Sequence, residues 1–86
     1  MAKVEIYTTG NCIYCVAAKT LLKQKGYGYE EIRVDGDPER LVEMLGRSQR
    51  RSVPQVYIDG EYIGGYEELA AAERAGRLAA PEGETS

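Results

Sequence analysis

The stretch YTTGNCIYCVAAK, residues 7–19, contains both cysteines of the chain, Cys12 and Cys15. Residues 3–9 alternate and are rich in β-formers, which predicts a strand. Residues 12–25 place apolar side chains at helical spacing, with lysines toward the C-terminal end, which predicts a helix. We therefore expect the cysteine pair at the point where the first strand gives way to the first helix.

A second strand and a second helix are predicted after this unit. Residues 27–35 contain the strand. Asp37 followed by Pro38 is a helix-start signal, because a capping side chain precedes a residue that needs no N–H donor in the first turn. The apolar positions that follow predict a helix running to about Ser48 or Gln49.

A hairpin and a third helix complete the prediction. Asp59-Gly60 is a strong turn signal between two short strands in residues 54–65. Residues 66–75 are rich in Ala and Glu and predict a helix that ends at Gly76. The full order is strand, helix, strand, helix, strand, strand, helix. It predicts an α/β fold with a four-stranded mixed sheet flanked by three helices.

Length and composition fit one small domain. The chain has 86 residues, a formal net charge of −3 and no His, so it lacks the basic surface that nonspecific nucleic-acid binding needs. No apolar run approaches the ~18 residues of a membrane span, and the N-terminus shows no signal peptide. We therefore expect a cytoplasmic protein that binds neither membrane nor nucleic acid. Residues 79–86 contain Pro and Gly and predict a flexible C-terminal tail.

The spacing of Cys12 and Cys15 favours a redox-active pair. At a helix N-terminus several backbone N–H groups lack intrahelical partners, and they can stabilise a thiolate at Cys12, the form that attacks disulfides. Cys15 lies one turn further along and should be less exposed. Side chains at this spacing face one another on a helix, so a reversible disulfide can form between them. We therefore predict that Cys12 is the nucleophile and Cys15 its redox partner.

Other interpretations of these polar residues stay open at this point. A structural disulfide would close a very short loop and would restrict the unfolded chain little. Two inert buried cysteines would both have to leave a helix start, which normally faces solvent. A closed zinc site cannot be built from two Cys without His. Arg47, Arg50 and Arg51 form a cluster that is either a solvated helix end, where cations suit the helix dipole, or an anion site.

Three motifs together resemble the glutaredoxin family, in particular the small bacterial dithiol glutaredoxins of the glutaredoxin 3 type. They are CIYC at 12–15, Val-Pro at 53–54 within SVPQVYIDG, and Gly-Gly at 64–65 within IGGYEEL. The resemblance spans about residues 3–76. It implies a thioredoxin-like fold, with the glutaredoxin domain at residues 1–78.

The resemblance also implies a glutathione site beside the cysteines. It implies a cis peptide bond between Val53 and Pro54, with the Val53 backbone pairing with the peptide as a strand edge would. The Gly-Gly pair would let the backbone come close to the ligand, and the N–H groups at the start of the third helix would suit the γ-glutamyl carboxylate. Arg50 would lie near the glycyl carboxylate, with Arg51 as the fallback. The glutathione-binding residues implied in this way are Tyr14, Arg50, Ser52, Val53, Pro54, Gly65, Tyr66 and Glu67.

The activity that the resemblance implies is that of an enzyme, a glutathione-disulfide oxidoreductase acting on protein disulfides and glutathione–protein mixed disulfides. Cys12 would attack the substrate, and Cys15 would resolve protein mixed disulfides by forming a Cys12–Cys15 disulfide. Glutathione would be the reductant, with no tightly bound cofactor. The implied partners are glutathione and disulfide-containing or glutathionylated proteins, with ribonucleotide reductase a candidate among them and glutathione reductase acting indirectly. A monomer is expected.

Three positions depart from the family pattern. Thr9 stands where many glutaredoxins have Lys, which removes a cation near the thiolate, and Glu67 stands where Asp is usual. Ile13 stands where the common dithiol motif has Pro. Relatives without that Pro more often assemble a 2Fe-2S cluster between two subunits, held by the first Cys of each subunit, here Cys12, and two glutathiones. Such an iron-sulfur dimer is the alternative function. A thioredoxin-like donor recharged by thioredoxin reductase is a third hypothesis, which the Gly64-to-Glu67 stretch disfavours.

Overall fold

The computed structural model describes residues 3–76 of the chain. The predicted domain boundary at 78 and the tail predicted at 79–86 lie outside the described residues. The order of elements confirms the prediction, and each boundary falls within one or two residues of the expected place. The elements are β1 (Val4–Thr8), α1 (Ile13–Gln24), β2 (Tyr29–Arg33), α2 (Pro38–Ser48), β3 (Gln55–Ile58), β4 (Glu61–Gly64) and α3 (Tyr66–Arg74).

The four strands form one mixed sheet in the order β2-β1-β3-β4. β1 pairs in parallel with β2 and antiparallel with β3, and β3 pairs antiparallel with β4. The parallel pair needs a crossover, which α1 supplies, whereas a tight turn joins the antiparallel pair β3 and β4. This is the thioredoxin-like arrangement that the family resemblance implied.

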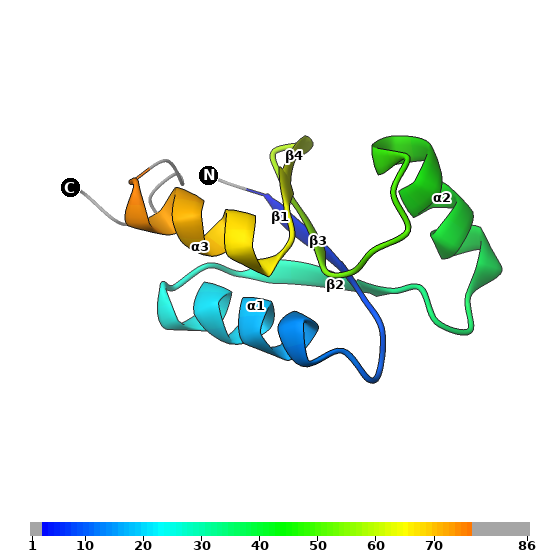
Figure 1. Ribbon diagram of the computed structural model, residues 1–86, viewed down its shortest axis with the longest axis horizontal. Coiled ribbons are helices and arrows are strands. Elements are labelled where there is room, and N and C mark those ends of the chain that lie inside the picture. The colour runs from blue at the N-terminus through cyan, green and yellow to red at the C-terminus, as the bar shows by residue number, and fades with distance from the viewer. Residues whose placement is uncertain (1–2, 77–86) are drawn as a thin grey trace.

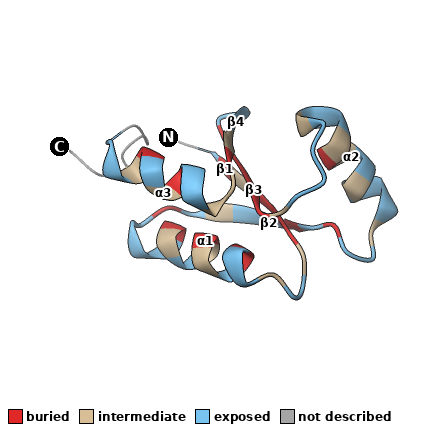
Figure 2. Ribbon diagram, viewed as in Figure 1, coloured by how far each residue is buried: buried red, intermediate tan, exposed pale blue. Residues whose placement is uncertain are grey.

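The helices cover both faces of the sheet. In Figure 1, α1 and α3 lie side by side, and α2 lies apart from them. Alternation along the strands sends one set of side chains toward α1 and α3 and the other toward α2, so the core has two parts, with buried residues on the central strands (Figure 2). The part under α1 and α3 consists of Val4, Ile6, Ala18, Leu22, Tyr27, Val56, Ile58 and Leu69. The part under α2 consists of Tyr7, Ile32, Val34, Met44 and Tyr57.

Short sequence signals set the boundaries of the elements. The Asp37 side chain accepts a hydrogen bond from the Arg40 N–H at 3.2 Å, which caps α2 as predicted. Asp59 and Gly60 both have positive φ, 53° and 83°, the conformation of a tight hairpin turn. None of the helices within residues 3–76 is long and apolar enough to cross a membrane.

Candidate active site

Cys12 occupies the N-cap position of α1 rather than the first turn of the helix. Its backbone is extended (φ −110°, ψ 109°), and its Sγ accepts a hydrogen bond from the Cys15 N–H at 3.0 Å. The sulfur therefore takes the place that an oxygen side chain takes at most helix starts. An unpaired N–H of the first turn is thus directed at the sulfur atom that carries charge when the thiol ionises.

Cys15 lies one turn inside the helix and is 1% exposed. Burial, followed by its contact with Cys12, raises the pKa of the Cys15 thiol to about 12. Both cysteines are free thiols, and Cys12 is partly exposed. The pair therefore has two unlike members, with the accessible sulfur at Cys12 and a protonated, enclosed thiol at Cys15.

The loop opposite the cysteines presents a backbone carbonyl to them. The Val53–Pro54 peptide bond is cis, which confirms the expectation. The Cys12 thiol lies 3.7 Å from the Val53 carbonyl oxygen, to which it donates. The Gln55 side chain stabilises this loop, because its buried Nε2 donates hydrogen bonds to the carbonyls of Arg50 and Ser52 at 3.0 and 2.8 Å. The sequence signal did not single out Gln55.

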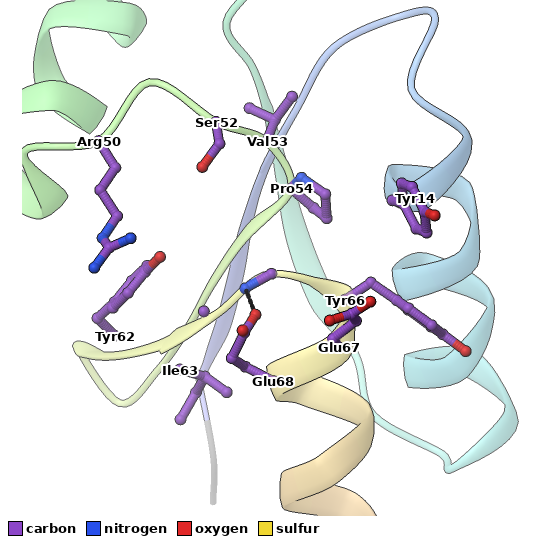
Figure 3. Close-up of a pocket in the computed structure, with 12 residues that line it drawn as sticks. Tyr14, Arg50, Ser52, Val53, Pro54, Tyr62, Ile63, Tyr66, Glu67 and Glu68 are labelled. Atoms are coloured by element: carbon purple, nitrogen blue, oxygen red, sulfur yellow. Dashed lines mark hydrogen bonds between the residues drawn. The ribbon is translucent and has the colours of Figure 1, made fainter.

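A pocket of about 440 Å³ opens beside this loop (Figure 3). Every residue that the resemblance assigned to glutathione lines it, so the structure brings together positions from α1, the loop before β3, and the start of α3. Arg51, the fallback to Arg50, is not among the lining residues. Gly64, which was expected to let the backbone come close to the ligand, lines the pocket too. Sequence reasoning did not assign three further lining residues to the ligand: Tyr62, Ile63 and Glu68.

A side chain from the first turn of α3 caps the backbone N–H just before the helix. Glu68 Oε1 accepts a hydrogen bond from the Gly65 N–H at 2.9 Å, and this bond is drawn in Figure 3. Gly64 has φ +129°, and a Cβ there would lie 2.6 Å from the Glu68 Cβ. Gly64 therefore makes room for Glu68, and it also lines the pocket beside Gly65. A Cβ on Gly65 would make only ordinary contacts, the nearest at 3.4 Å.

The arginine cluster divides between two roles. Arg50 lines the pocket, and its guanidinium carbon lies 6.0 Å from the centroid of the Tyr62 ring. Arg47 points elsewhere: it stacks 3.9 Å from the Tyr57 ring centroid and pairs with Glu5 at 3.3 Å. Only Arg50 is therefore placed to meet an anion in the pocket, and Arg47 joins α2 to the sheet.

The surface around Cys12 is apolar. Ile13 is 83% exposed, as expected for the residue that replaces Pro in the motif. Tyr14 and Val16 are also exposed, and the Tyr14 ring lies 6.2 Å from the Tyr66 ring, so that the starts of α1 and α3 meet through two aromatic rings. Three exposed apolar or aromatic side chains therefore follow Cys12 at the start of α1.

Known proteins resemble this chain over most of its length. The family model named Glutaredoxin matches residues 4–63. Glutaredoxin 3 of Escherichia coli is 46% identical over 78 residues, which cover 91% of this chain and 94% of that protein. The solution structure of glutaredoxin from Brucella melitensis is 39% identical, with a TM-score of 0.79, and the match covers 100% of this chain and 96% of that one. A buckwheat glutaredoxin–glutathione complex is 29% identical, with a TM-score of 0.80, over 90% of this chain and 73% of that one.

Proposed function

This chain belongs to the glutaredoxin family, and on that premise we propose that it is a glutathione-dependent thiol–disulfide oxidoreductase. The observation that carries the proposal is the position of the Cys12 sulfur. It accepts the Cys15 N–H at 3.0 Å and lies 3.7 Å from the Val53 carbonyl, next to the pocket. A sulfur supported at a helix start and a backbone edge that can pair with a peptide thus lie side by side.

The first route uses Cys12 alone. The Cys12 thiolate attacks the glutathione sulfur of a glutathionylated protein, a Cys12–glutathione disulfide forms, and the protein thiolate leaves and takes up a proton. A second glutathione thiolate then attacks the bound glutathione sulfur. Glutathione disulfide leaves and the Cys12 thiolate is regenerated. In total the protein thiol is reduced and one glutathione thiol is oxidised, because the glutathione first held by the protein was already part of a disulfide. Cys15 takes no part in this route.

The second route uses both cysteines on protein disulfides. Cys12 attacks one sulfur and forms a mixed disulfide with the substrate, and the other substrate thiolate leaves. Cys15 loses its proton and attacks the Cys12 sulfur, which releases the second substrate thiolate and leaves a Cys12–Cys15 disulfide. Because burial keeps the Cys15 thiol protonated, with a pKa of about 12, this step requires the proton to be removed as the bond forms.

The pocket supports glutathione as the co-substrate. The Val53 backbone offers a strand-like edge to its cysteinyl part. The first N–H groups of α3 suit the γ-glutamyl carboxylate, and Arg50 offers a cation to the glycyl carboxylate. The buckwheat neighbour is itself a glutaredoxin–glutathione complex. The two carboxylates would thus bind at opposite ends of the pocket, with the cysteinyl sulfur directed at Cys12.

A pair of serine variants tests the assignment of roles. We expect Cys12→Ser to abolish deglutathionylation of a glutathionylated peptide, because no nucleophile remains. Cys15→Ser should keep most of the rate, since the first route needs only Cys12. Reduction of a protein disulfide should fall in both variants. An equal loss of deglutathionylation in both variants would contradict the proposal. The glutathione-coupled assay, run with each of the two substrates, measures these rates.

Ile13 favours one alternative, an iron-sulfur dimer. Its side chain is 83% exposed beside Cys12, which leaves the nucleophile accessible to a second subunit. Cys12 would be the only ligand from each chain, and glutathione thiolates would supply the others. Anaerobic incubation with iron, sulfide and glutathione tests this reading. Visible absorbance together with a dimer on gel filtration would support the alternative, and a colourless monomer would exclude it.

A further inference from the structure

The loop that leads into Cys12 is hydrogen-bonded to a side chain just beyond β2. This loop, residues 9–11, joins the end of β1 to the N-cap of α1. The Gly10 N–H, two residues before Cys12, donates to Asp35 Oδ2 at 2.9 Å. Asp35 follows closely after the end of β2. The Asp35 side chain, which lies in the connection between β2 and α2, thus accepts a hydrogen bond from a backbone N–H of the loop that leads into Cys12.

Asp35 is in turn fixed by a two-point ion pair. Arg33 Nε donates to Oδ1 at 2.8 Å and Nη2 donates to Oδ2 at 2.7 Å. Such a bidentate pair restricts orientation as well as distance. The Arg33 guanidinium, followed by the Gly10 N–H, holds the pKa of the Asp35 carboxyl well below its usual range. The carboxylate therefore stays ionised at every pH at which the thiol chemistry runs.

The pairing of β1 with β2 positions the residues next to the Arg33–Asp35 ion pair. Arg33 lies opposite Thr8 in the parallel pairing of β1 and β2, and the Val34 N–H donates to the Thr8 carbonyl at 3.0 Å. The Gly10–Asp35 bond is the next link beyond this last ladder contact. It continues the connection between the two strands into the loop, where regular pairing has ended.

The residue at position 10 is constrained by Arg33. A Cβ on Gly10 would lie 2.6 Å from Arg33 Nη2 and 3.1 Å from Asp35 Oδ2. Gly10 is not among the residues with positive φ, so its backbone angles do not demand glycine. A side chain at position 10 would therefore displace the exposed Arg33 guanidinium, which lies directly against the main chain of the loop.

We propose that Arg33, Asp35 and Gly10 form a clamp that positions Cys12 for attack on disulfides, with Arg33 and Asp35 as positioning residues. The inference rests on the proposed function for its biological meaning. The clamp also places a cation beside the loop at which Thr9 replaces the Lys of many relatives.

The clamp should act on the chemical step more than on ligand binding. None of its three residues lines the pocket, so loosening it leaves the glutathione contacts in place. It would instead free the main chain before Cys12, and the Sγ would spend less time in contact with the Cys15 N–H and the Val53 carbonyl. Misplacement of a reacting group on this scale lowers kcat while KM stays near its original value.

The test measures Cys12 reactivity without glutathione. In the Cys15→Ser background, reduced protein is mixed with dithiodipyridine, a neutral aromatic disulfide. Cys12 attacks one sulfur and releases one absorbing thiopyridone. We expect Arg33→Ala, Asp35→Asn and Gly10→Ala each to slow this single turnover roughly fivefold to tenfold, the order expected when a reacting group is no longer held in place. In the glutathione-coupled assay the same variants should lower kcat and leave KM unchanged.

A double variant separates the clamp from a general loss of packing. Gly10→Ala acts by displacing the Arg33 guanidinium, so adding it to Arg33→Ala should cost almost nothing more. Glu73→Gln is the matched control, because it removes an acid from an exposed ion pair with Lys25, and that pair joins the far ends of α1 and α3. Its rate should equal that of the parent.

Two comparisons of rates among the variants would overturn the clamp. One is a parental rate in both Arg33→Ala and Asp35→Asn. The other is additive losses in the Gly10→Ala, Arg33→Ala double variant. Urea unfolding of each variant identifies losses that merely follow global stability, and a slowing that tracks the unfolded fraction would also contradict a positioning role. If the parent fails to deglutathionylate peptides, the proposed function fails while the dithiodipyridine rates still decide on the clamp.

Discussion

At the scale of single residues, the two cysteines of one short motif have opposite environments. Cys12 has its sulfur at a helix start and partly in solvent, whereas Cys15 is 1% exposed. The spacing that lets them form a disulfide also places the second sulfur under the first turn of α1. One sulfur is therefore suited to attack external disulfides, and the other is suited to attack only a disulfide already formed on its neighbour.

This difference predicts selective alkylation. Because burial raises the pKa of the Cys15 thiol to about 12, almost no thiolate exists there at about pH 8, where a free cysteine ionises substantially. We expect iodoacetamide to add one group to the folded, reduced protein, at Cys12. In guanidinium chloride both cysteines should react. Intact-mass and peptide mass spectrometry give the count, and two adducts on protein that remains folded would contradict the buried, protonated state of Cys15.

At the scale of elements, two adjacent glycines have different structural roles at the junction between β4 and α3. Gly64 has φ +129° and faces the Glu68 side chain, whereas Gly65 is the N-cap of α3 and lines the pocket. The sequence pattern treats the pair as one motif. Both glycines line the pocket, but of the two only Gly64 has a chain conformation that requires glycine.

The difference between the two glycines predicts different consequences for their alanine variants. Gly64→Ala combines a strained φ with a Cβ 2.6 Å from the Glu68 Cβ, so we expect it to lower the free energy of unfolding by ~2 kcal/mol or more. Gly65→Ala meets only ordinary contacts and should change stability by less than ~1 kcal/mol. Its methyl group borders the pocket, so KM for glutathione should rise several-fold.

Urea unfolding and steady-state kinetics distinguish the two effects. Gly65→Ala serves as the control for Gly64→Ala, because both introduce the same atom at adjacent positions. Equal loss of stability in the two variants would show that any side chain disrupts the start of α3. Unchanged KM in Gly65→Ala would argue against a ligand that reaches this end of the pocket.

At the scale of the whole molecule, local signals predicted the elements and their order. Asp37-Pro38 marked the start of α2, and Asp59-Gly60 marked the hairpin, because capping and turn chemistry depend on a few adjacent residues. The resemblance supplied the long-range part: the positions assigned to glutathione are distant in sequence and meet in one pocket.

Two of the contacts that the sequence missed depend on how the segments pair. Asp35 reaches Gly10 only because β1 and β2 are parallel neighbours with Thr8 opposite Arg33. Tyr62 enters the pocket because β4 forms the sheet edge beside Arg50. No local pattern carries this information, since each side chain alone is an ordinary surface residue. Such contacts require the strand register before they can be predicted.

Two buried ionisable groups link the packing of the whole molecule to pH. Burial is the main cause that raises the pKa of Cys15, to about 12, and that of Tyr7. In the unfolded chain these groups titrate at about 8.5 and 10. Between its two values each group binds fewer protons in the unfolded chain than in the native one, so the free energy of unfolding falls as pH rises. The contribution of Cys15 is fully present below about pH 8.5 and is lost up to about pH 12.

We therefore expect the reduced protein to lose about 1 kcal/mol per pH unit through Cys15 above about pH 9. Cys15→Ala lacks this titration and should show a shallower decline from about pH 9 to about pH 10.5, while the contribution of Tyr7 is common to both proteins. Urea unfolding at several pH values, with a phosphine reductant present, measures the two slopes. Parallel slopes would mean that the Cys15 thiol ionises as readily in the native protein as in the unfolded chain. Its enclosure beneath Cys12 would then give no protection from solvent, and the division of labour between the two sulfurs would lose its physical basis.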